Sequence, residues 1–433
     1  MSLETIRNYN QRMAEAYCQH YGLDIFNPEM TVESQEVFAH RIHNKETQLY
    51  PGVQLRVQNI DLPDGSFTRS YDVLFNPDDN SLDQSIFTAN QPFYLRRLLR
   101  NNHQLLTAIN AGFFFLTDDV TPQPLERGLN LVVRNRLPMS LPVTNRAAVM
   151  EYDGKLRVQE IAARGIIQIG NADVKWIGSR VHEMVNRDSV LYSAASSKIQ
   201  HIRSSTTGSR RVLIQESAKT PENPEMIDVA ISLDIQNTSM IVSKIVDGGG
   251  SDFLNSNFTL QIPKSNVRSL LKVGDRVTPL ILDEVDFSHI ESAISIGPSI
   301  DHFIYNNDHD INHDPSLGSR PPFVDRRMAC SVIYKDNGGL IHLRVFDGAP
   351  RTKSFQGLAP QEVAKLIPPD SVQWAYHLDP GQSSKLVTKP AEGKVESFGN
   401  NHYLRWPKNV NQTFLWNGPN GRPVASAITI GIK

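Results

Sequence analysis

Three polar motifs follow apolar runs in the sequence and have residue types that could do chemistry. Segment 110–112 is Asn-Ala-Gly, and its glycine permits a tight turn that directs the Asn110 amide into a cleft. Segments 347–348 (Asp-Gly) and 379–384 (Asp-Pro-Gly-Gln-Ser-Ser) end two further runs. A carboxylate near glycine and hydroxyl groups suits acid–base catalysis or phosphate binding. The same residues form ordinary turns, so both interpretations stay open.

Two arginines stand near these carboxylates in the sequence. Arg327 precedes a predicted strand, and Arg351 follows the Asp347 turn. A guanidinium group can hold a phosphate through two parallel hydrogen bonds, which would suit a phosphorylated substrate. Surface ion pairs account for both arginines equally well.

Two further segments gather residues typical of binding sites. The glycine run 248–250 follows Asp247 but lacks the lysine of a phosphate-binding P-loop, and a flexible connection is the alternative. His309 and His313 are four residues apart, as on one helical face, but they complete no zinc signature, which favours a solvated loop. We therefore predict no metal and no cofactor.

Short strand-like runs, mostly bounded by glycine, aspartate or asparagine, must position these motifs. They are predicted at 53–57, 71–75, 105–109, 129–133, 147–152, 190–192, 211–214, 226–233, 239–245, 276–280, 328–334, 341–346 and 425–430. Helices are predicted at about 94–101 and 359–367. Strands far outnumber helices, which predicts a β-dominated α+β fold.

The pattern divides the chain into three parts. Apolar residues at mixed three- and four-residue spacing predict an amphipathic helix within 3–21, so residues 1–45 are expected to form a helical N-terminal extension. Residues 46–104 are expected to form a strand-rich region packed on the main domain. Residues 105–433 are expected to be that main domain.

The composition is that of a soluble globular protein. The 433 residues include 46 acidic and 44 basic side chains, a net charge of −2, which gives no overall attraction to nucleic acid polymers or anionic membranes. Cys18 and Cys330 are too few for a disulfide framework. With no evident signal peptide or spanning segment, we expect a cytoplasmic protein that binds no membrane. Non-classical export and the oligomeric state are left open.

The order of the motifs resembles the phosphodiester glycosidase family over about residues 108–430. The resemblance begins with Asn-Ala-Gly-Phe-Phe at 110–114 and is stronger in the second half of the chain. The matching segments also include Gly128, 145–154, Asn186, 190–192, 262–277, 297–298, Arg-Met-Ala-Cys-Ser at 327–331, Asp-Gly at 347–348, Leu-Asp-Pro-Gly-Gln-Ser-Ser at 378–384 and 422–427.

The resemblance implies a phosphodiester-glycosidase-like domain. It also places the glycine run 248–250 too early in the chain to be the family's catalytic motif, so we expect this run to lie outside the site. Its implied reaction is hydrolysis of a sugar-1-phosphodiester, such as one of N-acetylglucosamine, at the sugar C1–O bond. Asp379 is the first choice for the catalytic carboxylate and Asp347 the second, and Asn110 would orient substrate oxygens. The implied substrate-binding residues are Arg327, Gly112, Gly348, Gly381, Ser383, Ser384, His377 and Arg422.

Four positions depart from the family's motifs. Pro380 and Gln382 replace glycines, His377 replaces an asparagine and Ser331 replaces a glycine. Proline has no backbone N–H to offer a substrate. One alternative is therefore a glycan or phospho-ligand binding protein on the same fold. Another is a phosphodiesterase that cleaves a P–O bond in a nucleotide-like diester, with a metal at the histidine pair.

Overall fold

A computed structural model defines most of the chain and is dominated by strands. It describes residues 41–114, 128–179, 181, 189–196, 199–204, 208–213, 218–234, 236, 238–266, 271–282, 285–300, 327–348, 353–390, 393–400, 404–405, 415–416 and 421–433. Two α-helices occur in these residues, α3 (Leu95–Asn101) and α6 (Pro360–Leu366). The predicted β-dominated fold is confirmed. The predicted helix within 3–21 lies outside the described residues.

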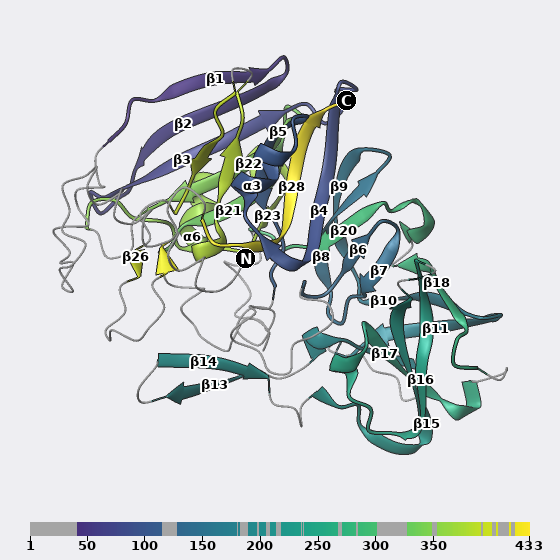
Figure 1. Ribbon diagram of the computed structural model, residues 1–433. Coiled ribbons are helices and arrows are strands. Elements are labelled where there is room, and N and C mark those ends of the chain that lie inside the picture. Colours follow the sequence, from purple (N-terminus) through teal and green to yellow (C-terminus); the bar gives the residue numbers. More distant parts are fainter. Residues whose placement is uncertain are drawn as a thin grey trace.

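The first sheet joins strands from the two ends of the sequence. It has the order β1-β2-β3-β22-β21-β23, and every pair is antiparallel. Its strands are β1 (Lys45–Tyr50), β2 (Val53–Asp61), β3 (Phe67–Phe75), β21 (Cys330–Asp336), β22 (Ile341–Asp347) and β23 (Val372–His377). Buried residues alternate with less buried ones at the start of β2, as expected for a strand with one face in the core. Figure 1 shows β1–β3 beside β21–β23.

The second sheet carries α3 and the C-terminal strand. Its order is β25-β24-β5-β28-β4, and it consists of β4 (Leu82–Phe93), β5 (Leu105–Asn110), β24 (Leu386–Thr388), β25 (Glu396–Phe398) and β28 (Val424–Ile432). Leu95 and Leu99 of α3 pack against residues of this sheet, including Ala108, Val387 and Ala427. Two short strands, β26 (Leu404–Arg405) and β27 (Leu415–Trp416), pair separately.

The third sheet completes the core that the first two sheets share. Its order is β7-β6-β20-β8-β9, with β6 (Val132–Arg134), β7 (Leu137–Ser140), β8 (Arg146–Tyr152), β9 (Lys155–Ile161) and β20 (Ser292–Ser295). One hydrophobic cluster contains Leu343 of the first sheet, Ile109 of the second and Val149 of the third. On its other side the first sheet packs against α6 through Val332 and Val363.

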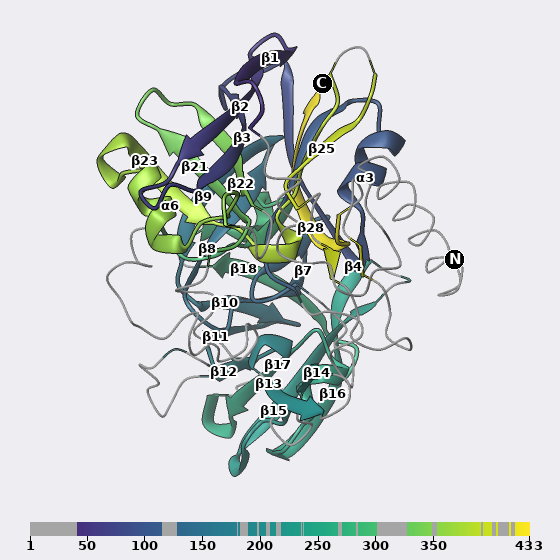
Figure 2. The same cartoon turned by 90° about the vertical axis from the view of Figure 1, so that its left-hand side faces the viewer.

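The fourth sheet is the largest and lies at one end of the molecule. Its order is β10-β11-β12-β17-β15-β16-β18-β19, and a further pairing of β10 with β18 closes it on itself. Its strands are β10 (Arg164–Ile169), β11 (Ala172–Gly178), β12 (Ser189–Tyr192), β15 (Glu222–Asp234), β16 (Ser239–Gly249), β17 (Phe258–Pro263), β18 (Arg276–Leu282) and β19 (Val285–Asp286). Figures 1 and 2 show these teal strands below the other sheets. The hairpin β13 (Ile199–Ser204) and β14 (Gly208–Leu213) pairs separately.

The polar motifs fall at the ends of strands in the first and second sheets. Asn110 ends β5, Asp347 ends β22, and the segment 379–384 connects β23 to β24. Because β24 pairs with β5 and β22 lies in the facing sheet, three connections far apart in the sequence meet at one place.

Candidate functional site

Asp347 is a buried carboxylate at the end of β22. It is 1% exposed and lies directly opposite Arg69 of β3 in the antiparallel register. Its Oδ1 accepts the backbone N–H groups of Gly348 and Asn400, both at 2.9 Å. Its Oδ2 is buried and accepts no hydrogen bond from any described residue. A buried carboxylate oxygen of this kind is uncommon, and a catalytic role or a bound group is one explanation for it.

The turn at Gly399–Asn400 connects Asp347 to the loop after β23. Both residues have a positive φ, +82° for Gly399 and +51° for Asn400. A Cβ on Gly399 would lie 2.7 Å from Val345 Cγ1, so this position requires glycine. The Asn400 side-chain amide donates to the carbonyl of Ser384 at 3.0 Å and, in a closer contact, to that of Gly381.

The loop after β23 places a second buried polar atom in this region. It contains the 3-10 helix η7 (Gly381–Ser383), and its Gly381 N–H donates to the carbonyl of Ala329 at 2.7 Å. The Ser384 hydroxyl donates to the same carbonyl at 3.1 Å. The Ser383 hydroxyl is buried without a hydrogen-bond partner among the described residues. Ser384 therefore holds the loop in place, whereas the Ser383 hydroxyl is available for a ligand.

Lys385 is a buried lysine beside this loop that the sequence analysis did not select. It is 2% exposed, and its Nζ donates to the carbonyl of Gly399 at 2.7 Å. Burial lowers its pKa from 10.5 to about 7, an effect that Asp347 opposes and Arg96 of α3 reinforces. Strongly perturbed pKa values gather at functional sites. The only sequence signal was a lysine directly before the apolar start of β24.

Arg69 and Tyr71 of β3 also lie near Asp347 and were not selected from the sequence. Arg69 Nη1 donates to the Tyr71 hydroxyl at 3.3 Å, and its guanidinium lies over Phe355 at 4.7 Å. Burial and the charge of Asp347 raise the pKa of Tyr71 to about 12. Phe398 stacks on Tyr71 with ring centroids 4.8 Å apart. Asp347 thus lies in an enclosed region that contains cationic and hydroxyl groups.

Asn110 and Asp379 are brought together, through the backbone of Asp379. The Asn110 amide donates to the Asp379 carbonyl at 2.7 Å. Its oxygen accepts the Ser331 hydroxyl at 2.7 Å and the Lys385 N–H at 3.0 Å. These contacts use the Asn110 side chain to connect β5, β21 and the loop after β23. The Asp379 residue is half-buried, and its N–H donates to the carbonyl of Ala111 at 2.9 Å.

Gly112 and Gly348 occupy positions where backbone packing leaves no room for a side chain. A Cβ on Gly112 would lie 2.4 Å from the Ser295 carbonyl oxygen, and one on Gly348 would lie 1.9 Å from the Gly357 nitrogen. Close packing therefore accounts for both glycines.

His377 and Arg422 lie in different surroundings. His377 is buried at the end of β23, and burial lowers its pKa to about 4, so its ring is neutral at pH 7. The Arg422 guanidinium lies over the Phe114 ring at 5.5 Å. Neither geometry tests the binding roles that the resemblance implies.

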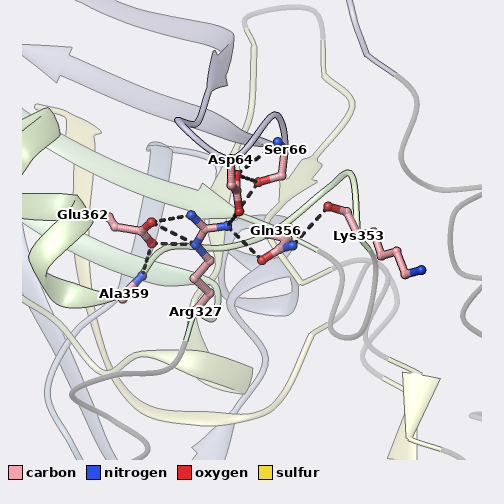
Figure 3. A network of polar contacts seen from close by, with 7 residues as sticks. All are labelled: Asp64, Ser66, Arg327, Lys353, Gln356, Ala359 and Glu362. Atoms are coloured by element: carbon pink, nitrogen blue, oxygen red, sulfur yellow. Dashed lines mark hydrogen bonds and ion pairs between the residues drawn. The ribbon is translucent and has the colours of Figure 1, made fainter.

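Arg327 belongs to an ion-pair network, which Figure 3 shows. Its Nε donates to both Glu362 carboxylate oxygens at 2.9 and 2.8 Å, and its Nη1 donates to Asp64 at 2.5 Å. The pKa of Asp64 falls to about 2, chiefly through hydrogen bonds from Ser66 and Arg327. The guanidinium thus joins the β2–β3 turn to α6, and no described contact connects it to Asp347.

The glycine run 248–250 lies in the fourth sheet, at the end of β16. All three glycines have a positive φ, between +80° and +83°. The next residue, Ser251, donates its N–H to Thr220 and Asp228 at 2.9 and 3.1 Å. No contact between described residues connects this run to Asp347.

His309, His313 and Arg351 lie outside the described residues. Within the described part of the chain, no three His, Cys, Asp or Glu residues are arranged to hold a metal ion. In the same part, no helix is long and apolar enough to cross a membrane.

Comparison with known proteins shows a shared fold but assigns no activity. No family model and no curated protein matches the chain. A hypothetical protein from Synechocystis is similar with a TM-score of 0.52 and 17% identity over 91% of this chain, which spans 64% of that protein. A Burkholderia pseudomallei K96243 protein named "Putative exported protein" has a TM-score of 0.48 and 13% identity, covering 84% of this chain and 74% of that one.

A more distant similarity is to the catalytic domain of zebrafish N-acetylglucosamine-1-phosphodiester alpha-N-acetylglucosaminidase, auto-inhibited by its pro-peptide. The TM-score is 0.37 and the identity 12%, with 93% of this chain and 92% of that chain covered. A similarity at this level carries no conclusion about fold, substrate or activity.

Proposed function

We propose that this protein is a hydrolase that cleaves the sugar C1–O bond of a sugar-1-phosphodiester and releases a free sugar and a phosphomonoester. The observation that carries this proposal is the Asp347 carboxylate. One of its oxygens is held by two backbone N–H groups, and the other is buried without a described partner. A carboxylate held in this way can act on a ligand without first breaking a contact of its own.

The chemistry needs one carboxylate and positive charge. The C1–O bond breaks with its electron pair on the phosphate oxygen, and a water oxygen forms the new bond to C1. The water loses its proton to the carboxylate, which also stabilises an oxocarbenium-like transition state. Because phosphate is a weak base, its departure depends on positive charge more than on proton donation.

Asp347 is our choice for this carboxylate, ahead of Asp379. We assign the positive charge near the phosphate to Arg69, because Glu362 and Asp64 already neutralise Arg327. The Ser383 hydroxyl would bind a substrate oxygen. The direct attack of water described above inverts the configuration at C1. Asp379 would be a second carboxylate of the site, and retention would require it to attack C1 before water does.

Product analysis in oxygen-18 water tests the proposal. The substrate is the methyl diester of N-acetylglucosamine 1-phosphate, and the control is the Asp347→Asn variant. We expect the label in the released sugar, and far less product from the variant. Label in the phosphate would instead show P–O cleavage by a phosphodiesterase. Binding of the diester without product would indicate a binding protein.

A further inference from the structure

A single peptide group lies between Lys385 and Asp347. The carbonyl of Gly399 accepts a hydrogen bond from Lys385 Nζ at 2.7 Å. The N–H of the same peptide, which belongs to Asn400, donates to Asp347 Oδ1 at 2.9 Å. A cation and a carboxylate thus contact opposite ends of one amide. Hydrogen bonds arranged in a chain through an amide polarise one another.

This peptide is held in one orientation. Both flanking residues have a positive φ, and Gly399 lies against Val345 too closely for a side chain. The Asn400 side chain is fixed by the carbonyls of Gly381 and Ser384. The peptide cannot rotate without losing several of these contacts, so the contact from Lys385 fixes the N–H that holds Asp347.

The surroundings of the two ends differ in charge. Lys385 faces Asp347 of β22 and Arg96 of α3. Asp347 lies opposite Arg69 in the register of β3, with Tyr71 nearby. Lys385 and Asp347 are 2% and 1% exposed, so water screens their interaction little.

We propose that Lys385 is a positioning residue that orients Asp347 through the Gly399–Asn400 peptide. This inference rests on the proposed function only for the role it gives to Asp347. The charged ammonium polarises the Gly399 carbonyl and makes the Asn400 N–H a stronger donor. That donor holds Oδ1 and leaves Oδ2 directed at the reacting sugar. Deprotonation of Lys385, whose pKa is about 7, weakens these two linked hydrogen bonds.

The test measures the Asn400 amide signal by NMR in the full chain labelled with 15N-asparagine. The signal is identified by its loss in Asn400→Asp. In the wild type we expect its chemical shift to titrate with a midpoint near pH 7, and in Lys385→Met we expect no titration. The Lys389→Met variant, just after β24, is the control and should titrate like the wild type. Asp347→Asn should move the signal at every pH.

Activity is measured in parallel on the same diester. Lys385→Met should lower kcat with little change in KM. If the Asn400 chemical shift changes neither with pH nor in Lys385→Met, Lys385 does not act on Asp347 through this peptide. The proposal would then be wrong even if the wild type hydrolyses the diester. An Asn400 signal that titrates in a protein that does not hydrolyse the diester would support the positioning role of Lys385 and refute the proposed function. If Lys385→Met does not fold, the wild-type titration and Asp347→Asn decide the question.

Discussion

Replacing Lys385 with methionine should remove a specific pH dependence of stability. The pKa of this lysine falls from 10.5 to about 7 on folding, mainly because burial penalises the ammonium. Between these two values the unfolded chain holds the proton and the folded chain does not. Unfolding therefore takes up a proton, so the free energy of unfolding rises with pH across this window. Below it, the cost of burying the charge is fully present.

The size of the effect follows from the pKa shift. Each pH unit inside the window contributes about 1.4 kcal/mol. At about pH 6, Lys385 is mostly charged in both states, whereas about pH 9 lies two units above its folded pKa, so the contribution grows by about 3 kcal/mol between them. Methionine has similar length and no charge, so the variant should lack this part of the pH dependence.

Urea unfolding followed by tryptophan fluorescence measures the difference. The stability gap between wild type and Lys385→Met is determined at both pH values, which cancels groups that titrate alike in the two proteins. Lys389→Met serves as the control, because Lys389 is only half-buried and lies just after the same strand. A gap that stays the same at both pH values would mean that Lys385 keeps its proton, and the account of its burial would be wrong.

Three further outcomes are expected. Asp347→Asn should lower kcat by about 10²–10⁴ and change KM little, because asparagine keeps the shape but cannot act as a base; Asp379→Asn is measured beside it, and near-normal kcat in Asp347→Asn would place the base elsewhere. Arg327→Met should lower the free energy of unfolding by about 1–3 kcal/mol through loss of its Glu362 and Asp64 contacts, with kcat and KM unchanged. A raised KM without loss of stability would instead indicate that Arg327 binds the phosphate. Gly399→Ala should lower the thermal unfolding temperature more than Gly393→Ala does. Both glycines have a positive φ, but only at Gly399 would a Cβ meet a neighbour, Val345 Cγ1 at 2.7 Å. Equal losses would show that Val345 moves aside.

Strands buried along nearly their whole length were predictable from the sequence, and strands that mix polar residues with few apolar ones were not. The predicted runs 71–75 and 341–346 lie within β3 and β22, where nearly every residue is buried. By contrast, β4 is Leu-Asp-Gln-Ser-Ile-Phe-Thr-Ala-Asn-Gln-Pro-Phe and was missed. It buries only three residues, one of them a glutamine, so hydrophobic periodicity gives little signal.

The convergence of the polar motifs was predictable in part. Strand ends could be assigned for Asn110 and Asp347, and the fold does bring Asn110 to the backbone of Asp379. The partner of Arg327 could not be assigned, because an arginine before a strand is compatible with a phosphate or with a carboxylate. Its Asp64 partner is supplied by the β2–β3 turn, which only the tertiary structure brings near α6.

The contact between Asn400 and Asp347 was beyond sequence analysis for a different reason. Its donor is a backbone N–H, which every residue except proline carries, so no residue type marks it. What the sequence does record is the conformation that directs this N–H: glycine and asparagine, the residues that most readily take a positive φ, stand side by side at 399–400. The contact of Lys385 could not be predicted either, because only the tertiary structure brings its Nζ within hydrogen-bond distance of the Gly399 carbonyl. Buried carboxylates held by the backbone are therefore best sought from the Gly-Asn turns around them.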